Sequence, residues 1–296
     1  MRFTLNVRMA GSSNDMMRLF RLAQTVGFVA YVVATLIPIP AIMLLCAVVS
    51  SPLRLIGLHP VDFFQHFVGI CTSILCIRHS FVPGHASVAQ RGTIILANHR
   101  SWCDFAVDNH ITHASCISRM SVQYAMLLAG ALQVYEQRAI RFHRGQTSKE
   151  DLYARVSTHM RRPPSPRSSC VLLYPEGTRR RHVRLSSVDE CKATLKPGLL
   201  WMIYQKGQYP VQVVISSNKE RALDERAWTI RLGVAIRTYS GTVLHPKDFA
   251  SFDEFMDAIA TQWLEAWTAT HSADEDVSNA TGCKVGRNSI DSSALY

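Results

Sequence analysis

The sequence predicts an α/β fold: a mixed, mostly parallel sheet flanked by helices, with an N-terminal membrane-associated helical pair. From about residue 87 onward, short runs rich in β-branched residues alternate with stretches of helical periodicity, a pattern typical of such sheets. Two long apolar stretches, 26–49 and 61–77, lie upstream. With 296 residues, 48% of them apolar, the chain has room for one large domain and an appendage.

The first apolar stretch, 26–49, carries no charge and follows a basic segment over 1–25. As one helix it is about 36 Å long, enough to cross a hydrocarbon core of roughly 30 Å. Pro38 and Pro40 lie near its centre, where they kink or break a helix. Two short halves that dip into one leaflet are therefore an alternative to a span. A buried core helix is the alternative for a soluble protein.

The second apolar stretch, 61–77, is interrupted by Gln65 and His66. This pattern predicts an amphipathic helix and not a spanning one. Together the two stretches predict a membrane-anchoring pair. We therefore assign residues 1–86 to a basic segment followed by anchoring helices.

The α/β domain is expected over 87–271, where predicted strands alternate with predicted helices. Strands are predicted at 92–97, 170–174, 210–216 and 228–236, and helices at 103–110, 118–133, 148–161, 197–206 and 251–270. Residues 161–169 are rich in Pro, Ser and Arg and predict a loop. The tail, 272–296, is rich in Ser, Asn and Asp, which predicts disorder.

The charge balance indicates an anionic partner. The formal net charge is +10, from 32 Lys and Arg against 22 Asp and Glu, which suits a lipid surface, a phosphorylated substrate or nucleic acid. Nucleic acid is disfavoured because no recognition motif accompanies the basic residues and because of the apolar stretch 26–49. The eight cysteines include no CxxC and the twelve histidines no HExxH, so we expect reduced thiols, no metal site and no cofactor.

The stretch LANHRSWCDF, 96–105, places His99 and Asp104 after an apolar run. On one straight helix, residues five apart point about 140° away from each other. The two side chains can therefore meet only if His99 lies on the loop and Asp104 on the first helical turn. Ser101 and Asp104 also have the S-x-x-D spacing of a capping box. A catalytic pair and a helix cap beside a surface histidine are thus both open, and the two are compatible.

The stretch YPEGTRRRHVR, 174–184, also follows an apolar run, CVLLY. Gly177, Thr178 and Arg179 provide backbone amides, a hydroxyl and a guanidinium fork suited to a phosphate. The alternative is a solvated basic turn, with Glu176 merely orienting the loop.

The two stretches together resemble the glycerolipid acyltransferase superfamily, whose members carry an N-H-x4-D block followed by an E-G-T-R block. Here these read Asn98-His99 with Asp104, and the run from Glu176 to Arg179. The resemblance covers roughly 60–240 and is strongest to the 1-acylglycerol-3-phosphate acyltransferases. In IRFHRG, 140–145, Arg144 matches a glycerol-phosphate-binding block, while His143 replaces its usual Asp.

The resemblance implies an acyl-CoA-dependent esterification of lysophosphatidic acid to phosphatidic acid, with acyl-CoA as co-substrate. It implies His99 as general base, Asp104 as its orienting carboxylate, and a phosphate site formed by five residues: Arg144, Glu176, Gly177, Thr178 and Arg179. It further implies a bilayer with anionic lipids as partner, at the endoplasmic reticulum with the catalytic domain facing the cytosol, or at a mitochondrial membrane. The alternatives are a remodelling enzyme, acting on lysocardiolipin or another lysophospholipid or as a tafazzin-like transacylase, and a non-catalytic lipid-binding protein.

Overall fold

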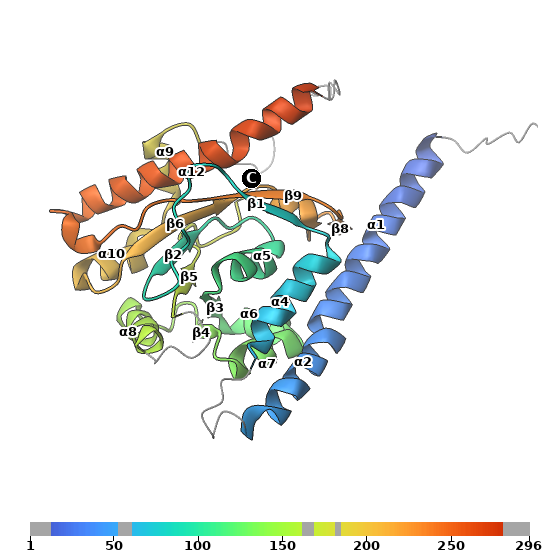
Figure 1. The fold of residues 1–296 in the computed structure, drawn as a ribbon, viewed down its shortest axis with the longest axis horizontal. Helices are drawn as coiled ribbons and strands as arrows, with labels where there is room; N and C mark the ends of the chain where they lie inside the picture. Colours follow the sequence, from blue (N-terminus) through green and yellow to red (C-terminus); the bar gives the residue numbers. More distant parts are fainter. Residues whose placement is uncertain (1–12, 53–60, 162–168, 181–184, 281–296) are drawn as a thin grey trace, which may run out of the picture.

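The sheet is seven-stranded in the computed structural model, which describes residues 13–52, 61–161, 169–180 and 185–280. The strand order is β1-β9-β6-β2-β5-β3-β4 (Figure 1). Its strands are β1 (Arg78–Phe81), β2 (Ile94–Ala97), β3 (Ser115–Arg119), β4 (Ala139–Phe142), β5 (Val171–Leu173), β6 (Val211–Ser216) and β9 (Ala235–Ser240). Among the described strands of this sheet, only β6 and β9 pair antiparallel. The predicted mixed, mostly parallel sheet is confirmed.

The central strands β2 and β5 are apolar throughout, and β6 is mostly apolar, because both faces of the sheet are covered. Alternate residues of β2 enter different clusters: Ile94 and Leu96 belong to one core, Ile95 and Ala97 to another. Every residue of β2 and of β6 is buried. The run IILA is therefore a strand buried on both sides.

Helices cover the two faces as separate groups (Figure 1). The first core contains side chains of α8 (Lys149–Met160), α9 (Val188–Thr194), α10 (Pro197–Lys206) and α12 (Phe252–Ala280). On the other side lie α4 (Phe63–Ile74), α5 (Cys103–Thr112) and α7 (Leu127–Tyr135), which share a core with α2 (Pro38–Val49). The short helices α6 (Met120–Ala125) and α11 (Lys219–Ala222) complete the set, with a 3-10 turn, η1, at Pro246–Asp248.

Two of the predicted elements are wrong. The stretch 228–236 is not one strand: β8 (Thr229–Ile230) pairs with β7 (Leu223–Asp224), and β9 begins only at Ala235. Gly233, with φ +72°, turns the chain between β8 and β9. The stretch 118–133 is not one helix either, because it contains the end of β3, then α6, and most of α7.

The N-terminal apolar stretch forms α1 (Ser13–Leu36) and α2, which meet at Ile37. The break follows from Pro38, which occupies the first turn of α2 and has no N–H to donate. In Figure 1, α1 extends beyond the α/β body. Within the described residues, the run Asp15–Val49 is long and apolar enough to cross a membrane.

The amphipathic helix predicted at 61–77 is present as α4, but its apolar side is not available to a bilayer. Phe64, Phe67 and Val68 are buried in the core shared with α2, α5 and α7. At the other end of the chain, α12 continues to Ala280, so the tail predicted as disordered begins with helix. The remainder of that tail, 281–296, lies outside the described residues, as does most of the loop predicted at 161–169.

Candidate active site

His99 and Asp104 meet at the junction of β2 and α5. Nδ1 of His99 lies 2.7 Å from Oδ2 of Asp104. A carboxylate only accepts, so Nδ1 carries the proton and Nε2 is the basic nitrogen. The side chain of Asp104 is 1% exposed, whereas that of His99 is 27% exposed and can be reached by a ligand. The loop-to-first-turn arrangement expected from the spacing is present.

Asp104 also caps the helix, so the capping interpretation is confirmed alongside the contact with His99. Its Oδ2 accepts the N–H of Ser101 at 3.2 Å and that of Arg100, in addition to the ring of His99. The hydroxyl of Ser101 accepts the N–H of Cys103 at 3.0 Å. One oxygen therefore fixes the ring and the start of α5 together.

The loop after β5 is tied to the loop after β2. Glu176 is buried, and its Oε2 accepts the backbone N–H of His99 at 2.5 Å, while Oε1 lies 4.0 Å from the guanidinium of Arg100. Burial raises the pKa of Glu176, and Arg100 and the bond from His99 offset this only in part. The carboxylate of Glu176 therefore points into the protein and joins the two loops, and its assignment to a phosphate site stays a prediction.

Sequence reasoning missed a buried network behind the pair. Lys219, at the start of α11, bonds Asp108 on α5, and the hydroxyl of Tyr174 donates to Asp108 at 3.0 Å. The ring of Tyr174 stacks on that of His99, with centroids 4.5 Å apart. Tyr174 is the first residue of the stretch 174–184. Nothing in the sequence near Lys219 indicates a place in the site, because α11 lies more than a hundred residues downstream of His99.

The pKa shifts in this cluster keep its charges in place. Burial disfavours the Asp104 carboxylate, but Lys219 and the bonds from His99 and Arg100 outweigh it and lower the pKa of Asp104. Burial likewise opposes the Lys219 ammonium, yet Asp104 and Asp108 raise the pKa of Lys219. Burial raises the pKa of Asp108 to about 6, against the attraction of Lys219. At neutral pH all three groups are ionised.

The E-G-T-R loop surrounds Gly177 with cations. Gly177 has φ +67°, and a Cβ there would meet the side chain of Lys196 at 2.8 Å. Arg119, at the end of β3, donates to the carbonyl of Gly177 at 3.4 Å. Arg119 was missed because its strand is short and partly polar, SCISR.

The other predicted phosphate ligands lie at the same edge of the sheet but are not all available. Thr178 is exposed beside Gly177. Arg179 is paired through NH1 with Oε1 of Glu225 at 2.5 Å, and its side chain is 35% exposed. Arg144 is exposed in the turn after β4. Strands β2, β5, β3 and β4 are parallel neighbours, so the loops that carry His99, Arg119, Arg144 and Arg179 leave one edge together.

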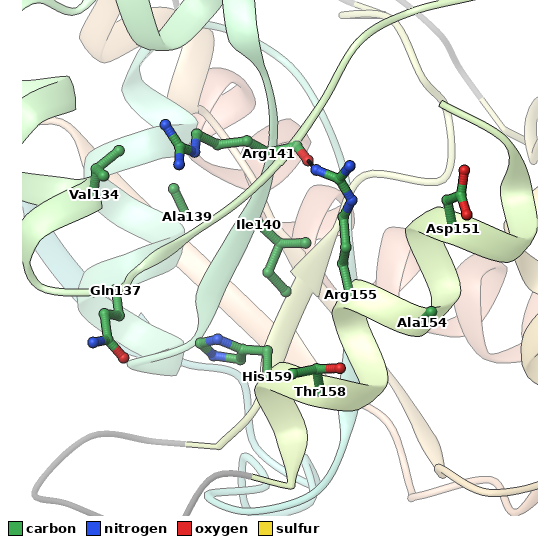
Figure 2. A pocket seen from close by; sticks show the side chains of 10 residues that line it. All are labelled: Val134, Gln137, Ala139, Ile140, Arg141, Asp151, Ala154, Arg155, Thr158 and His159. Carbon is green, nitrogen blue, oxygen red and sulfur yellow. Dashed lines mark hydrogen bonds between the residues drawn. The ribbon is translucent and has the colours of Figure 1, made fainter. Parts of the chain in front are cut away.

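A cavity of about 540 Å³ lies elsewhere, between β4 and α8. Figure 2 shows its lining, with the guanidinium of Arg155 directed at the carbonyl oxygen of Arg141, 3.0 Å away. No residue of the His99 site lines it. Within the described part of the chain, no group of three or more His, Cys, Asp or Glu side chains is arranged to hold a metal ion.

These contacts define what the arrangement can do chemically. An imidazole with a protonated Nδ1, held by an ionised carboxylate, can accept a proton at Nε2 and be stabilised as imidazolium. Cations stand at the neighbouring strand end. The geometry suits deprotonation of a hydroxyl on an anionic substrate.

Comparisons with known proteins agree with this geometry. Residues 79–217 match the family model described as Acyltransferase, a range that contains both loops. Among solved structures, the chain is similar to the 1-acyl-sn-glycerophosphate (LPA) acyltransferase PlsC from Thermotoga maritima. The TM-score is 0.63 at 15% identity, over 88% of this chain and 97% of that chain. No curated protein sequence matches the chain. Residues 79–217 are thus similar to the Acyltransferase family, and the chain shares the fold of that solved acyltransferase structure.

Proposed function

We propose that the protein transfers an acyl group from acyl-CoA to the free hydroxyl of 1-acylglycerol-3-phosphate, giving phosphatidic acid. The observation that carries the proposal is the 2.7 Å contact between His99 Nδ1 and Asp104 Oδ2, on a ring that remains partly exposed. The similarity to an LPA acyltransferase of known structure supports the substrate class.

In this proposal Nε2 of His99 removes the proton of the acceptor hydroxyl as its oxygen attacks the thioester carbonyl. Asp104 holds the ring and stabilises the imidazolium that forms. The C–S bond then breaks, and the imidazolium returns the proton to the departing CoA thiolate. General-base assistance of this kind contributes on the order of 10²–10⁴ in rate. The nucleophile is the acceptor itself, so no acyl-enzyme is required.

The acceptor phosphate is proposed to bind at the loops after β3, β4 and β5. Arg119 and Lys196 both contact Gly177, and Arg179 follows two residues later. Guanidinium groups bind phosphate through two parallel hydrogen bonds. Arg144 stands on the outermost of these strand ends and would reach the same anion from the far side.

Membrane attachment fits this chemistry, because both acyl chains reside in the bilayer. The surface of α1, up to its junction with α2, carries an exposed apolar stripe, which we define as Leu19, Leu22, Val26, Val29, Val33 and Ile37. Their spacing of three or four residues places them on one helix face. The proposal therefore has this stripe in the lipid, with the basic protein surface against anionic headgroups.

A remodelling acyltransferase is the second candidate, and one observation favours it. Glu225 holds the guanidinium of Arg179, so part of the charge meant for a phosphomonoester is already neutralised. A pocket of lower positive charge suits the phosphodiester of another lysophospholipid. The two candidates share the role of His99 and differ in the acceptor; in a tafazzin-like transacylase the donor differs as well, because it is a phospholipid and not acyl-CoA.

The test offers purified protein labelled acyl-CoA with lysophosphatidic acid, lysophosphatidylcholine and lysocardiolipin. We expect His99→Ala to lower kcat at least about 100-fold with its circular dichroism unchanged. Arg119→Ala should raise KM for lysophosphatidic acid more than for lysophosphatidylcholine, whereas Arg155→Ala, beside the cavity of Figure 2, should change neither.

Full turnover by His99→Ala would refute the general-base role. Preference of the wild-type protein for lysocardiolipin or lysophosphatidylcholine would decide for the second candidate. Binding of lysolipid without any turnover would decide for a lipid-binding protein.

A further inference from the structure

Lys219 is a fully buried lysine that the mechanism above does not use. Its Nζ donates to Oδ1 and Oδ2 of Asp108, at 2.9 and 2.8 Å, and to the carbonyl of Asn98 at 2.8 Å. Nζ also lies 3.5 Å from Oδ1 of Asp104. All three of its N–H groups are therefore directed at the loop and helix that carry the His99–Asp104 pair.

A buried ammonium is costly, so its position requires an explanation. Desolvation of an ion costs several kcal/mol in real proteins, and a hydrophobic replacement of a buried ion pair is often as stable. Stability alone therefore gives no reason to keep Lys219 and Asp108. Their place beside the catalytic carboxylate gives one.

The charges around the imidazole can be counted. Asp104 and Asp108 contribute two negative charges and Lys219 one positive charge, which leaves one net negative charge. Asp104 Oδ1 is buried without a hydrogen-bond partner within the described residues, and Lys219 is the cation that faces it. Because Lys219 offsets the charge of Asp108, the imidazole of His99 faces the net negative charge of one carboxylate.

We propose that Lys219 is a positioning residue for the His99–Asp104 pair: it neutralises Asp108, and it fixes Asp104 and the loop carbonyl of Asn98 so that the imidazole faces one net carboxylate charge. The proposal rests on the role of His99 as general base. It assigns to Asp108 the part of a counterion, which keeps Lys219 from cancelling Asp104.

The ring of His99 is held by the same network from its other side. Tyr174 stacks on the ring, and its hydroxyl donates to Asp108, which binds Lys219. The contacts form a closed circuit from His99 through Asp104, Lys219, Asp108 and Tyr174 back to His99. A change of charge at Lys219 therefore reaches the imidazole electrostatically and through packing.

Several other groups face the cluster and must stay constant in any test. The titratable or charged side chains that face it from the packed elements are His99, Arg100, Cys103, Asp104, Asp108, Tyr174 and Glu176. Only Asp108 and Lys219 are changed in the experiment below.

The experiment compares Asp108→Asn with Asp108→Asn/Lys219→Met, which differ only in the lysine charge. Protein labelled with ¹³C-histidine in detergent is titrated by NMR, and the His99 ring is assigned with His99→Gln. The summed charge of the side chains at positions 104, 108 and 219 is zero in the single variant. In the double variant it is minus one, the same as in the wild type. We expect the titration midpoint of the His99 ring to lie roughly one pH unit higher in the double variant.

The wild type should titrate close to the double variant, and the acid limb of the kcat profile should follow the same order. If Asp108→Asn prevents folding, Asp108→Ser gives the same charge. Midpoints that agree within about 0.2 pH unit would refute the proposal and leave Lys219 a structural role. The NMR result does not need turnover, so a failure of the proposed function and a failure of this inference are separate outcomes.

Discussion

Cys103 is a thiol next in sequence to Asp104, yet it is not placed to react. Its side chain is buried among Val107, Leu75 and the residues of α1 that pack there, and burial raises the pKa of Cys103 well above its usual range. A thiolate does not form under these conditions. We expect Cys103→Ala to keep kcat within about threefold while losing about 1 kcal/mol of stability. Loss of turnover in a folded Cys103→Ala protein would contradict this.

A substitution of Asp104 removes a negative charge as well as hydrogen bonds to His99, Arg100 and Ser101. An asparagine retains the side-chain shape but provides only one acceptor oxygen and no charge, so it cannot stabilise the imidazolium. We expect Asp104→Asn to lower kcat at least about 100-fold, with KM for the acceptor little changed. Steady-state kinetics with Asp151→Asn, an exposed position on α8, as control will check it. Equal kcat values in the two variants would remove Asp104 from the mechanism.

The difference between what the sequence predicted and what it missed is already clear at single residues. His99 and Asp104 lie five residues apart, so local geometry and a recognised spacing were enough to predict that their side chains meet. Glu176 was predicted as a site residue, but its bond to the backbone N–H of His99 was not, because that bond depends on the loop after β2. Lys219 could not be found, since only the pairing of β6 with β2 brings its helix to the site.

At the scale of elements, the fully buried central strands were predictable and the short, partly polar strands β1, β3 and β4 were not. β2 and β5 are continuous apolar runs, and β6 is mostly apolar, because helices cover both faces. The strands β1, β3 and β4, with sequences RHSF, SCISR and AIRF, are short and partly polar, and their pairing is set by neighbours. These missed strands include β3 and β4, which deliver Arg119 and Arg144 to the site.

The turn after β5 can be tested with a pair of glycines. Gly177 and Gly84 both have positive φ, +67° and +83°, but only Gly177 has a side chain, that of Lys196, where a Cβ would lie. We expect Gly84→Ala to cost about 1 kcal/mol and Gly177→Ala to cost more and to lower kcat as well. Thermal denaturation and turnover measure both. Equal losses would show that Lys196 moves aside freely and that this turn does not shape the site.

At the scale of the whole molecule, the fold places the basic loops at one edge of the sheet and leaves one face of α1 exposed. Parallel strands send their carboxyl-terminal loops to one edge, which gathers the imidazole and the cations. α2 packs on α4 and α7, α1 packs through Phe28 and Tyr31 on Cys103 and Val107 of α5, and the stripe on α1 stays uncovered. An uncovered apolar face of this length on a soluble surface would promote association.

The stripe gives the last prediction, on how the whole molecule meets a bilayer. Leu22 and Val26 are each 60% exposed, so charges there leave the core intact but must enter the lipid. We expect Leu22→Glu/Val26→Glu to weaken binding to anionic vesicles more than about 100-fold. Val243→Glu, an exposed apolar position away from the stripe, should bind as the wild type does. Sedimentation with vesicles at low and high salt separates the contributions: added salt should weaken the headgroup attraction and leave the stripe's share. Unchanged binding by the double variant would mean that another surface meets the membrane.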